Sequence, residues 1–250
     1  MAKSVGKQYA DEMKNKFGGG YHATWAPGVP LAVGDIGEFD NEGIFQKKAN
    51  LKKLQIPFEI YDDGTISQLD YVSKGSASVI TKLSGQTAPE GSTLATADAG
   101  IIVNFSKESA VVFSAKDVKY PSIEDQIKLE RDIIRLYKAK KWDRDWCIIT
   151  ELAKAEGATI IISNSSNSKI ELKANAKIAA TKIDIADAAF NFSTQFSKDV
   201  NTAIISQEEL TPLFKVKKLK GLFQDELKTR SLSYRSEATD VEEEISLEYF

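Results

Sequence analysis

Hydrophobic and polar residues alternate most regularly between Ile170 and Ile178, where even-numbered positions are apolar or small and odd-numbered positions are polar. A period of two is typical of a β-strand with one buried face and one solvated face. The residues before this segment, 163–168, are all serine or asparagine, which favours a turn. The sequence therefore predicts a long hairpin from Ala158 to Ile178. The charged side chains of its solvated face would be Glu171, Lys173 and Lys177.

Further runs of alternation predict more strands. Residues 66–83 form a second long extended segment, and a connection rich in glycine, serine and threonine follows it. We expect two long hairpins, which pair 66–83 with 99–115 and 158–172 with 178–196. The predicted fold class is therefore α+β: a twisted, mainly antiparallel sheet with long hairpins, flanked by helices.

Two segments have the period of an amphipathic helix. Residues 3–17 place an apolar side chain at every fourth position, and three glycines beginning at Gly18 end the pattern. Lysines occupy much of the remaining surface, so this helix either packs on the body of the protein or lies on a membrane. Residues 122–141 begin with Ser122 as a helix cap and end in lysines. The buried stripe of this second helix would be Ile123, Ile127, Ile134 and Tyr137.

The C-terminal region changes from basic to acidic, which divides the chain into a body, 1–230, and a tail, 231–250. Acidic runs are commonly solvated chain ends. This one finishes with alternating apolar side chains, which a solvated end does not need and which suit an added edge strand. The docking candidates are Ile245, Leu247, Tyr249 and Phe250. The basic residues that could meet a membrane surface are Lys215, Lys217, Lys218 and Lys220.

Removal of the tail would reverse the net charge. The whole chain carries −3, and residues 236–250 hold six acids and no bases, so a cut after Arg235 leaves +3. Each basic group brought close to an anionic membrane contributes about 1 kcal/mol of binding. Arg230 and Arg235 flank a short stretch of mostly small and polar residues, of the kind that proteases cut. We predict that a protease cleaves at one of these two arginines.

Composition argues against several classes of protein. A net charge near zero argues against nucleic acid as the main partner. Cys147 is the only cysteine, which excludes an intrachain disulfide and favours a reducing compartment. No apolar run reaches the roughly 20 residues of a membrane helix, and the N-terminus lacks the apolar core of a signal peptide. We therefore expect a soluble, cytoplasmic protein.

The sequence offers few residues for catalysis. His22 is the only histidine, and Cys147 has the apolar neighbours of a buried, unreactive thiol. There is no histidine–cysteine cluster that could hold a metal, and no glycine-rich phosphate loop. We expect no enzymatic activity, no metal and no cofactor.

The order of the predicted elements resembles the pore-forming domain of the gasdermin family. In that family a helix leads into a strand with a hydrophobic-VTEV motif and then into a charged, alternating hairpin. Here residues 146–152 end in the similar ITEL, and the alternating residues 158–172 follow. The resemblance covers roughly residues 66–220. The chain is similar in length to the bacterial members, which keep only a short inhibitory C-terminal peptide.

The resemblance implies a pore-forming cell-death effector of antiphage defence. A protease would remove the tail, and the remainder would insert paired hairpins at the inner face of the cell membrane. Its partners would be the activating protease, anionic lipid and further copies of the chain. The charged face that carries Glu171 would line the pore. The chain departs from the bacterial members at one feature, because they carry a lipidated cysteine near the N-terminus and Cys147 lies in mid-chain.

A non-enzymatic binding module is the alternative. The same alternation occurs in the half-buried sheet of a soluble α+β protein, whose acidic tail would dock a partner protein. The two hypotheses differ in one observation. After removal of the tail, a binding module stays a soluble monomer that ignores membranes.

Overall fold

The computed structural model describes residues 4–62, 64–175, 183–206, 209–221 and 245–249. Its helices are α1 (Val5–Phe17), α2 (Gln126–Lys138), the 3₁₀ turn η1 (Ile185–Asp187) and α3 (Ala188–Asn191). Its strands are β1 (Tyr21–Ala23), β2 (Asp35–Phe39), β3 (Phe45–Asn50), β4 (Ile60–Tyr61), β5 (Ser67–Val72), β6 (Ala77–Lys82), β7 (Gly100–Phe105), β8 (Val111–Val118), β9 (Ser122–Ile123), β10 (Cys147–Ala155), β11 (Gly157–Ser163), β12 (Lys169–Ala174), β13 (Phe192–Lys198), β14 (Val200–Ser206), β15 (Leu210–Gly221) and β16 (Ile245–Tyr249). Among these described elements, no helix combines the length and the apolar character needed to cross a membrane.

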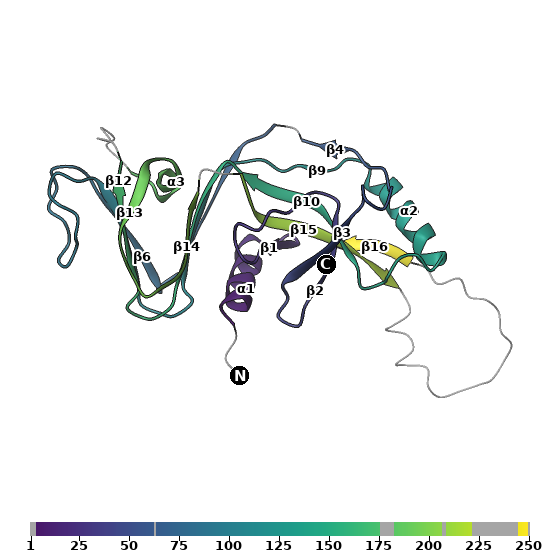
Figure 1. The fold of residues 1–250 in the computed structure, drawn as a ribbon, viewed down its shortest axis with the longest axis horizontal. Helices are drawn as coiled ribbons and strands as arrows, with labels where there is room; N and C mark the ends of the chain where they lie inside the picture. The colour runs from purple at the N-terminus through teal and green to yellow at the C-terminus, as the bar shows by residue number, and fades with distance from the viewer. Residues whose placement is uncertain (1–3, 63, 176–182, 207–208, 222–244, 250) are drawn as a thin grey trace, which may run out of the picture.

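The largest sheet forms one side of the molecule. Its central path runs β1-β15-β10-β2-β3, while β9 and β4 continue it beside β10 (Figure 1). The C-terminal strand β16 adds to the edge of β15. The strand pairs in the described part of the chain are antiparallel. The predicted α+β class, with a mainly antiparallel sheet, is therefore confirmed.

Two four-stranded sheets form the other side of the molecule and together make a V (Figure 1). The proximal sheet, in the order β14-β11-β8-β5, stands next to α1. The distal sheet, in the order β13-β12-β7-β6, forms the far wall, and α3 lies between the two walls. The V arises because four long β arms are each bent once. Arm one (67–82) contains β5 and β6, arm two (100–118) β7 and β8, arm three (157–174) β11 and β12, and arm four (192–206) β13 and β14.

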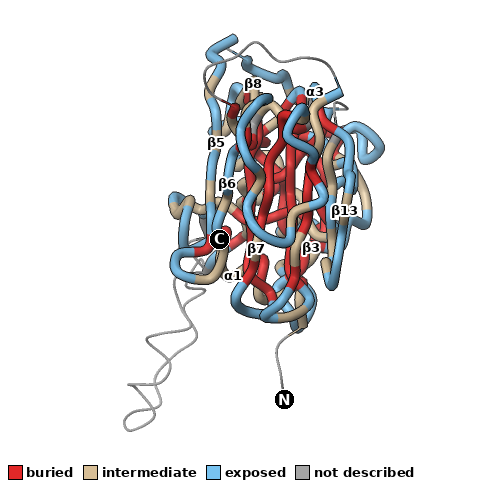
Figure 2. The backbone as a smooth tube through the Cα atoms, turned by 90° about the vertical axis from the view of Figure 1, so that its left-hand side faces the viewer, coloured by how far each residue is buried: buried red, intermediate tan, exposed pale blue. Residues whose placement is uncertain are grey.

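Three hydrophobic cores hold these layers together. The α2 core packs α2 against the large sheet and includes Ile36, Leu129, Ile133, Ile148, Phe214 and Leu247. The α1 core packs α1 against the proximal sheet and includes Tyr9, Met13, Val111, Phe113, Ile160 and Ile162. The V core fills the space between the two walls and includes Ile101, Val103, Val112, Ile161, Ile170, Leu172 and Ile185. Arms two and three are the central, buried arms, whereas β5 and β13 at the edges are largely exposed (Figure 2).

The first predicted helix is confirmed and the second is shorter than predicted. The side chain of Ser4 caps α1, whose buried face carries the predicted Tyr9 and Met13. Helix α2 begins only at Gln126, because Ser122–Ile123 pairs with β4 and β10 as strand β9. Of the predicted buried stripe, Ile123 is buried in strand β9, and Ile134 and Tyr137 are partly buried against the α2 core, but Ile127 is not buried. Ile127 is 66% exposed, and Leu129 and Ile133 are buried instead.

One predicted hairpin pairing is confirmed and the other is partly wrong. Arm one pairs with arm two along 67–82 and 100–118, as expected. Arm three pairs with 192–206, so the predicted partner segment 178–196 is right at 192–196, whereas η1 and α3 make 185–191 helical. The hairpin predicted within 158–178 is wrong, since β11 and β12 lie in different sheets and each pairs with other strands.

Candidate functional site

The bends of the four arms lie side by side and form a row of corners. The corner residues are 73–76 in arm one, 106–110 in arm two, 164–168 in arm three and Asp199 in arm four. Backbone hydrogen bonds join them across the row, from Ser73 N to Val111 O, from Ser163 N to Ala110 O and from Asn164 N to Asp199 O. The row is thus a continuous part of the sheet structure, in which each arm turns from the proximal wall to the distal wall.

In arm two, the odd-numbered positions carry an apolar face on both sides of the corner, although the even-numbered Ile102 and Val112 are also buried. The odd-numbered residues 101, 103 and 105 face the V core. The odd-numbered residues 111, 113 and 115 face the α1 core, on the opposite side of the proximal wall. Residues of one parity share one face of an extended strand. A straightened arm two would therefore combine the apolar residues of two separate cores into a single face.

Arms three and one follow the same rule. In arm three the even-numbered residues 158, 160 and 162 belong to the α1 core, and 170 and 172 to the V core. In arm one the odd-numbered Leu69 and Tyr71 pack on the α1 core, and Ala77 and Val79 pack on the V core. Arm four departs from the rule, because residues of both parities, Val200 and Ile205, pack on the V core. Three of the four described arms thus hold an apolar face that the bend divides between two cores.

The ladder between arms two and three keeps one register through the corner. Ile162 pairs with Val111 in the proximal sheet, and Lys169 pairs with Asn104 in the distal sheet. Both arms advance by seven residues between these pairs, so no residue is inserted or skipped. Straightening this pair therefore requires no exchange of hydrogen-bond partners. Between arms one and two the register shifts by two residues, which preserves parity.

Serine hydroxyl groups hold the corners in their bent form. The Ser163 hydroxyl donates to the carbonyl oxygen of Lys107 at 2.6 Å and accepts from the N–H of Ala110 at 2.9 Å. The Ser168 hydroxyl accepts from the N–H of Ser165 at 2.9 Å and also bonds to the carbonyl of Asp199. The sequence predicted turns from the residues 163–168, but it did not reveal that these hydroxyl groups join three arms.

The prediction that the charged face of β12 is solvated is wrong at Glu171, because this side chain is fully buried. A strap, residues 84–98 between β6 and β7, crosses this face of the distal sheet. Glu171 Oε2 accepts hydrogen bonds from Thr93 N at 2.8 Å and Thr93 Oγ1 at 2.6 Å, and Glu171 Oε1 lies 2.6 Å from Lys169 Nζ. Burial alone would raise the pKa of Glu171, but the bonds from Lys169 and Thr93 hold it below its ordinary value. Its charge is therefore kept inside the protein.

Three lysines attach the same strap to the distal sheet. Lys82 is 1% exposed, and its Nζ donates to the carbonyl oxygens of Ala95 at 2.8 Å, Thr96 at 3.2 Å and Asp98 at 2.5 Å. Lys173 pairs with the Asp98 carboxylate at 2.8 Å, and Lys169 donates to the carbonyl oxygen of Gly91 at 2.7 Å. Lys173 is half-buried, in part contrary to its predicted solvation. A pore-lining role for Glu171 and Lys173 belongs to another state and remains a prediction.

The C-terminal strand is attached to the body by main-chain and side-chain contacts. Strand β16 pairs along Lys217–Gly221 of β15, and Leu247 is 5% exposed within the α2 core. The N–H of Leu247 also donates to Glu130 Oε1 of α2 at 3.1 Å. Tyr249 is half exposed, and Lys217 Nζ lies 4.7 Å from the centre of its ring. Sequence reasoning did not identify Glu130, because only the fold brings α2 beside residue 247.

The four lysines of β15 have partners in this structure. Two of them contact the C-terminal strand. Lys217 lies over the ring of Tyr249, and Lys220 pairs with Glu248 at 3.0 Å. Lys215 pairs with Glu151 at 2.9 Å, and Lys218 pairs with Asp145 at 2.8 Å. Removal of β16 would therefore take away the partners of Lys217 and of the already exposed Lys220.

Several predicted site residues lie outside the described residues. These are the cleavage candidates Arg230 and Arg235, the pore-lining candidate Lys177 and the docking candidate Phe250. The backbone of Ile245 is described as the first residue of β16. The predicted boundary between body and tail, at 230–231, also falls in an undescribed segment.

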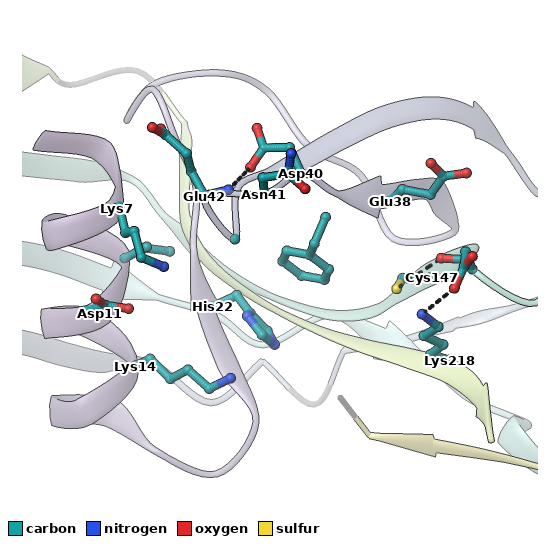
Figure 3. A pocket seen from close by; sticks show the side chains of 15 residues that line it. Lys7, Asp11, Lys14, His22, Glu38, Asp40, Asn41, Glu42, Cys147 and Lys218 are labelled. Atoms are coloured by element: carbon teal, nitrogen blue, oxygen red, sulfur yellow. Dashed lines mark hydrogen bonds and ion pairs between the residues drawn. The ribbon is translucent and has the colours of Figure 1, made fainter. Parts of the chain in front are cut away.

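His22 and Cys147, the two residues considered for catalysis, line one pocket. The pocket, of about 550 Å³, lies between α1, the loop 40–43 and the start of β10 (Figure 3). The His22 ring is buried against Phe39 and Phe214, at centroid distances of 4.7 Å and 5.7 Å. Charges of both signs line the wall, and no group of three or more metal-ligating side chains occurs in the searched, described part of the chain.

Cys147 should react slowly with thiol reagents in the native protein. Burial raises the pKa of its thiol to about 11, and the nearby Lys218 offsets only part of this rise. Only the thiolate reacts, so at pH 8 its fraction falls about 100-fold relative to a thiol of pKa 9. The measurement is the rate of colour release from a disulfide reagent, native against urea-unfolded, at one pH. Equal rates in the two states would contradict the buried, unreactive thiol.

Among the comparisons with known proteins, the one with solved structures finds a similarity. No protein-family model matches the chain, and no curated protein matches its sequence. The solved structure of a bacterial gasdermin from Bradyrhizobium tropiciagri is similar over 86% of this chain and 86% of its own, with a TM-score of 0.36 and 13% sequence identity. That structure is from the family that the sequence motifs resemble.

Proposed function

We propose that the chain is a pore-forming protein stored in a water-soluble form, and that its four bent arms straighten into membrane-spanning strands. One observation carries the proposal: the bend divides a single apolar face of arms one, two and three between two buried cores. A soluble sandwich needs buried apolar residues, but it does not need this shared parity across a bend. A membrane-spanning strand does need it, because one face must meet lipid along the whole length.

The arms are long enough for this role. They contain between 15 and 19 residues, from arm four (192–206) to arm two (100–118). A strand crosses the bilayer with roughly 9–11 residues. The continuous register of arms two and three supports the same change of shape, because the central ladder can straighten without breaking its pairing.

In the stored form, other elements cover the apolar face. Helix α1 covers the proximal half through Tyr9 and Met13, and η1 and α3 cover the distal half from within the V. Glu12 of α1 also accepts hydrogen bonds from Tyr71 at 2.9 Å and from Ser73, at the corner of arm one, at 2.6 Å. These contacts account for storage in water and would have to open before insertion.

Proteolysis in 222–244 is the proposed trigger. This segment joins β15 to β16 and contains Arg230 and Arg235. A cut there converts the attachment of β16 from intramolecular to bimolecular and so removes its high effective concentration, which is millimolar for short flexible linkers. Loss of β16 removes the partners of Lys217 and Lys220, and a cut after Arg235 changes the net charge from −3 to +3. Both changes favour an anionic membrane.

Dye release from anionic vesicles tests the proposal. The full chain is compared with the same chain cleaved between Arg230 and Arg235, at equal concentrations. We expect release only after cleavage, together with membrane-bound oligomers and, by the family resemblance, cell death as the biological result. No release in either case, with the cleaved chain a soluble monomer, would contradict the proposal and favour the binding module.

A further inference from the structure

We infer that the pore prefers anions, an inference that rests on the proposed function. The charged residues of the four described distal strands are mainly basic. Strands β6, β7, β12 and β13 contain four lysines and one acid: Lys82, Lys169, Lys173, Lys198 and Glu171. The distal strands end at the tips of the two hairpins, so they are the part of each arm that enters the bilayer first.

Parity assigns most of these charges to the water-filled side. Lys82 has the even, polar parity of arm one, and Lys169, Glu171 and Lys173 have the odd, polar parity of arm three. The apolar parity of the same strands carries Val79, Ile170 and Leu172. Charged side chains that face lipid are strongly disfavoured near the middle of the bilayer. The charged side chains must therefore face the lumen, with three lysines against one glutamate in the distal strands β6 and β12 of each copy, whereas Asp70 of the proximal strand β5 has the same polar parity.

In the stored form these lysines attach the strap to the distal sheet, and Lys82 does so at the cost of a buried charge. Lys82 is buried, its ammonium group donates to three backbone carbonyls of the strap, and the Asp98 carboxylate also interacts with its charge. Burial of a charge is costly even when its partners are good, and an apolar side chain in its place is often as stable. A lysine at position 82 thus costs stability in the soluble protein, and its charge becomes favourable where water replaces the strap.

Straightening would remove the partners that now neutralise these lysines. The strap is the connection at the tip of the hairpin formed by arms one and two, so it must leave the face of the sheet when the hairpin crosses the bilayer. Its two acids, Glu90 and Asp98, would then lie at the tip and not along the spanning strands. Rings of lysine in a pore attract anions, as rings of acids attract cations. The favoured solutes are small anions, among them chloride and phosphate-bearing molecules.

Planar-bilayer recording under a potassium chloride gradient tests the inference. The full chain is cleaved between Arg230 and Arg235, and the reversal potential is measured. We expect chloride to permeate better than potassium at 0.1 M salt. The preference should vanish near 1 M, where the screening length falls from about 10 Å to about 3 Å.

The test variant is Lys169→Gln with Lys173→Gln, and its matched control is Lys52→Gln with Lys128→Gln. Both variants lose two positive charges, but Lys52 and Lys128 are exposed and lie outside the arms. The test variant should shift the reversal potential towards the equilibrium potential of potassium, and the control should not. Lys173→Gln alone is a milder second variant, because the ion pair between Lys173 and Asp98 lies at a partly exposed site. The salt dependence of the unaltered chain needs no variant at all.

Each outcome decides the inference. A chloride preference that only the arm variants weaken supports it. Currents that favour potassium, show no preference, or respond equally to both double variants would overturn the inference and leave the pore intact. Absence of any current after cleavage would overturn the pore itself, and the anion preference with it.

Discussion

Substitution of Leu247 by glutamate should make the intact chain release vesicle contents without proteolysis. Burial of a leucine side chain contributes about 1.5–3 kcal/mol, and Leu247 is almost fully buried in the α2 core. A glutamate there would lose this contribution, bury an unpaired charge and lie near the carboxylate of Glu130. Strand β16 would then detach although the chain remains whole. Dye release should rise from background to the level of the cleaved, unaltered protein.

The matched control is the neighbouring substitution Glu248→Gln. Glu248 is exposed on β16, and its ion pair with Lys220 joins two exposed side chains, so it contributes little to docking. This variant should stay silent until it is cleaved. Hydrogen exchange of residues 217–221 reports detachment of β16 independently. If β16 detaches in Leu247→Glu and the intact chain still releases no dye, the C-terminal strand is not what keeps the protein in storage.

Sequence alternation predicted the strands better than their partners. Period-two patterns located arms one, two and three, and the apolar residues after the acidic run located β16. These features are local, because alternation over a few residues is enough to define a half-buried strand. The partner of arm three was predicted correctly only at 192–196, since the short helical turns at 185–191 interrupt the aromatic pattern before it and the strand continues to 206.

Exposure was harder to predict than secondary structure. The sequence shows that Glu171 is polar, but Thr93, which buries it, lies far away in the chain. The burial of Lys82 was also missed, because a lysine that ends a strand normally reaches water. The corners were missed for another reason: serine and asparagine favour both a hairpin turn and a bend between two sheets. Only the strand pairing distinguishes these alternatives.

Two adjacent valines should enter different surroundings when the arms straighten, one facing lipid and the other facing water, and this is the second large effect that we expect. Val111 and Val112 are both fully buried, yet Val111 faces the α1 core and Val112 faces the V core. Val103, on the other side of the corner, shares the V core with Val112. In a straight strand Val103 and Val111 have the same parity and face lipid, whereas Val112 faces the lumen. Val103 therefore shares its surroundings with Val112 in the bent arm and with Val111 in the straight arm.

Environment-sensitive dyes on single cysteines measure this exchange. Cysteine replaces Val103, Val111 or Val112 in turn, in a chain in which Cys147→Ala removes the native thiol. After cleavage on vesicles, nitroxide lipids should quench the dye at 103 and 111, and a water-soluble quencher should reach the dye at 112. If the corner remained bent, the dyes at 103 and 112 would respond alike and differ from the dye at 111. That result would show that the two halves of each arm never form one face, and the proposed route into the membrane would fail at its central step.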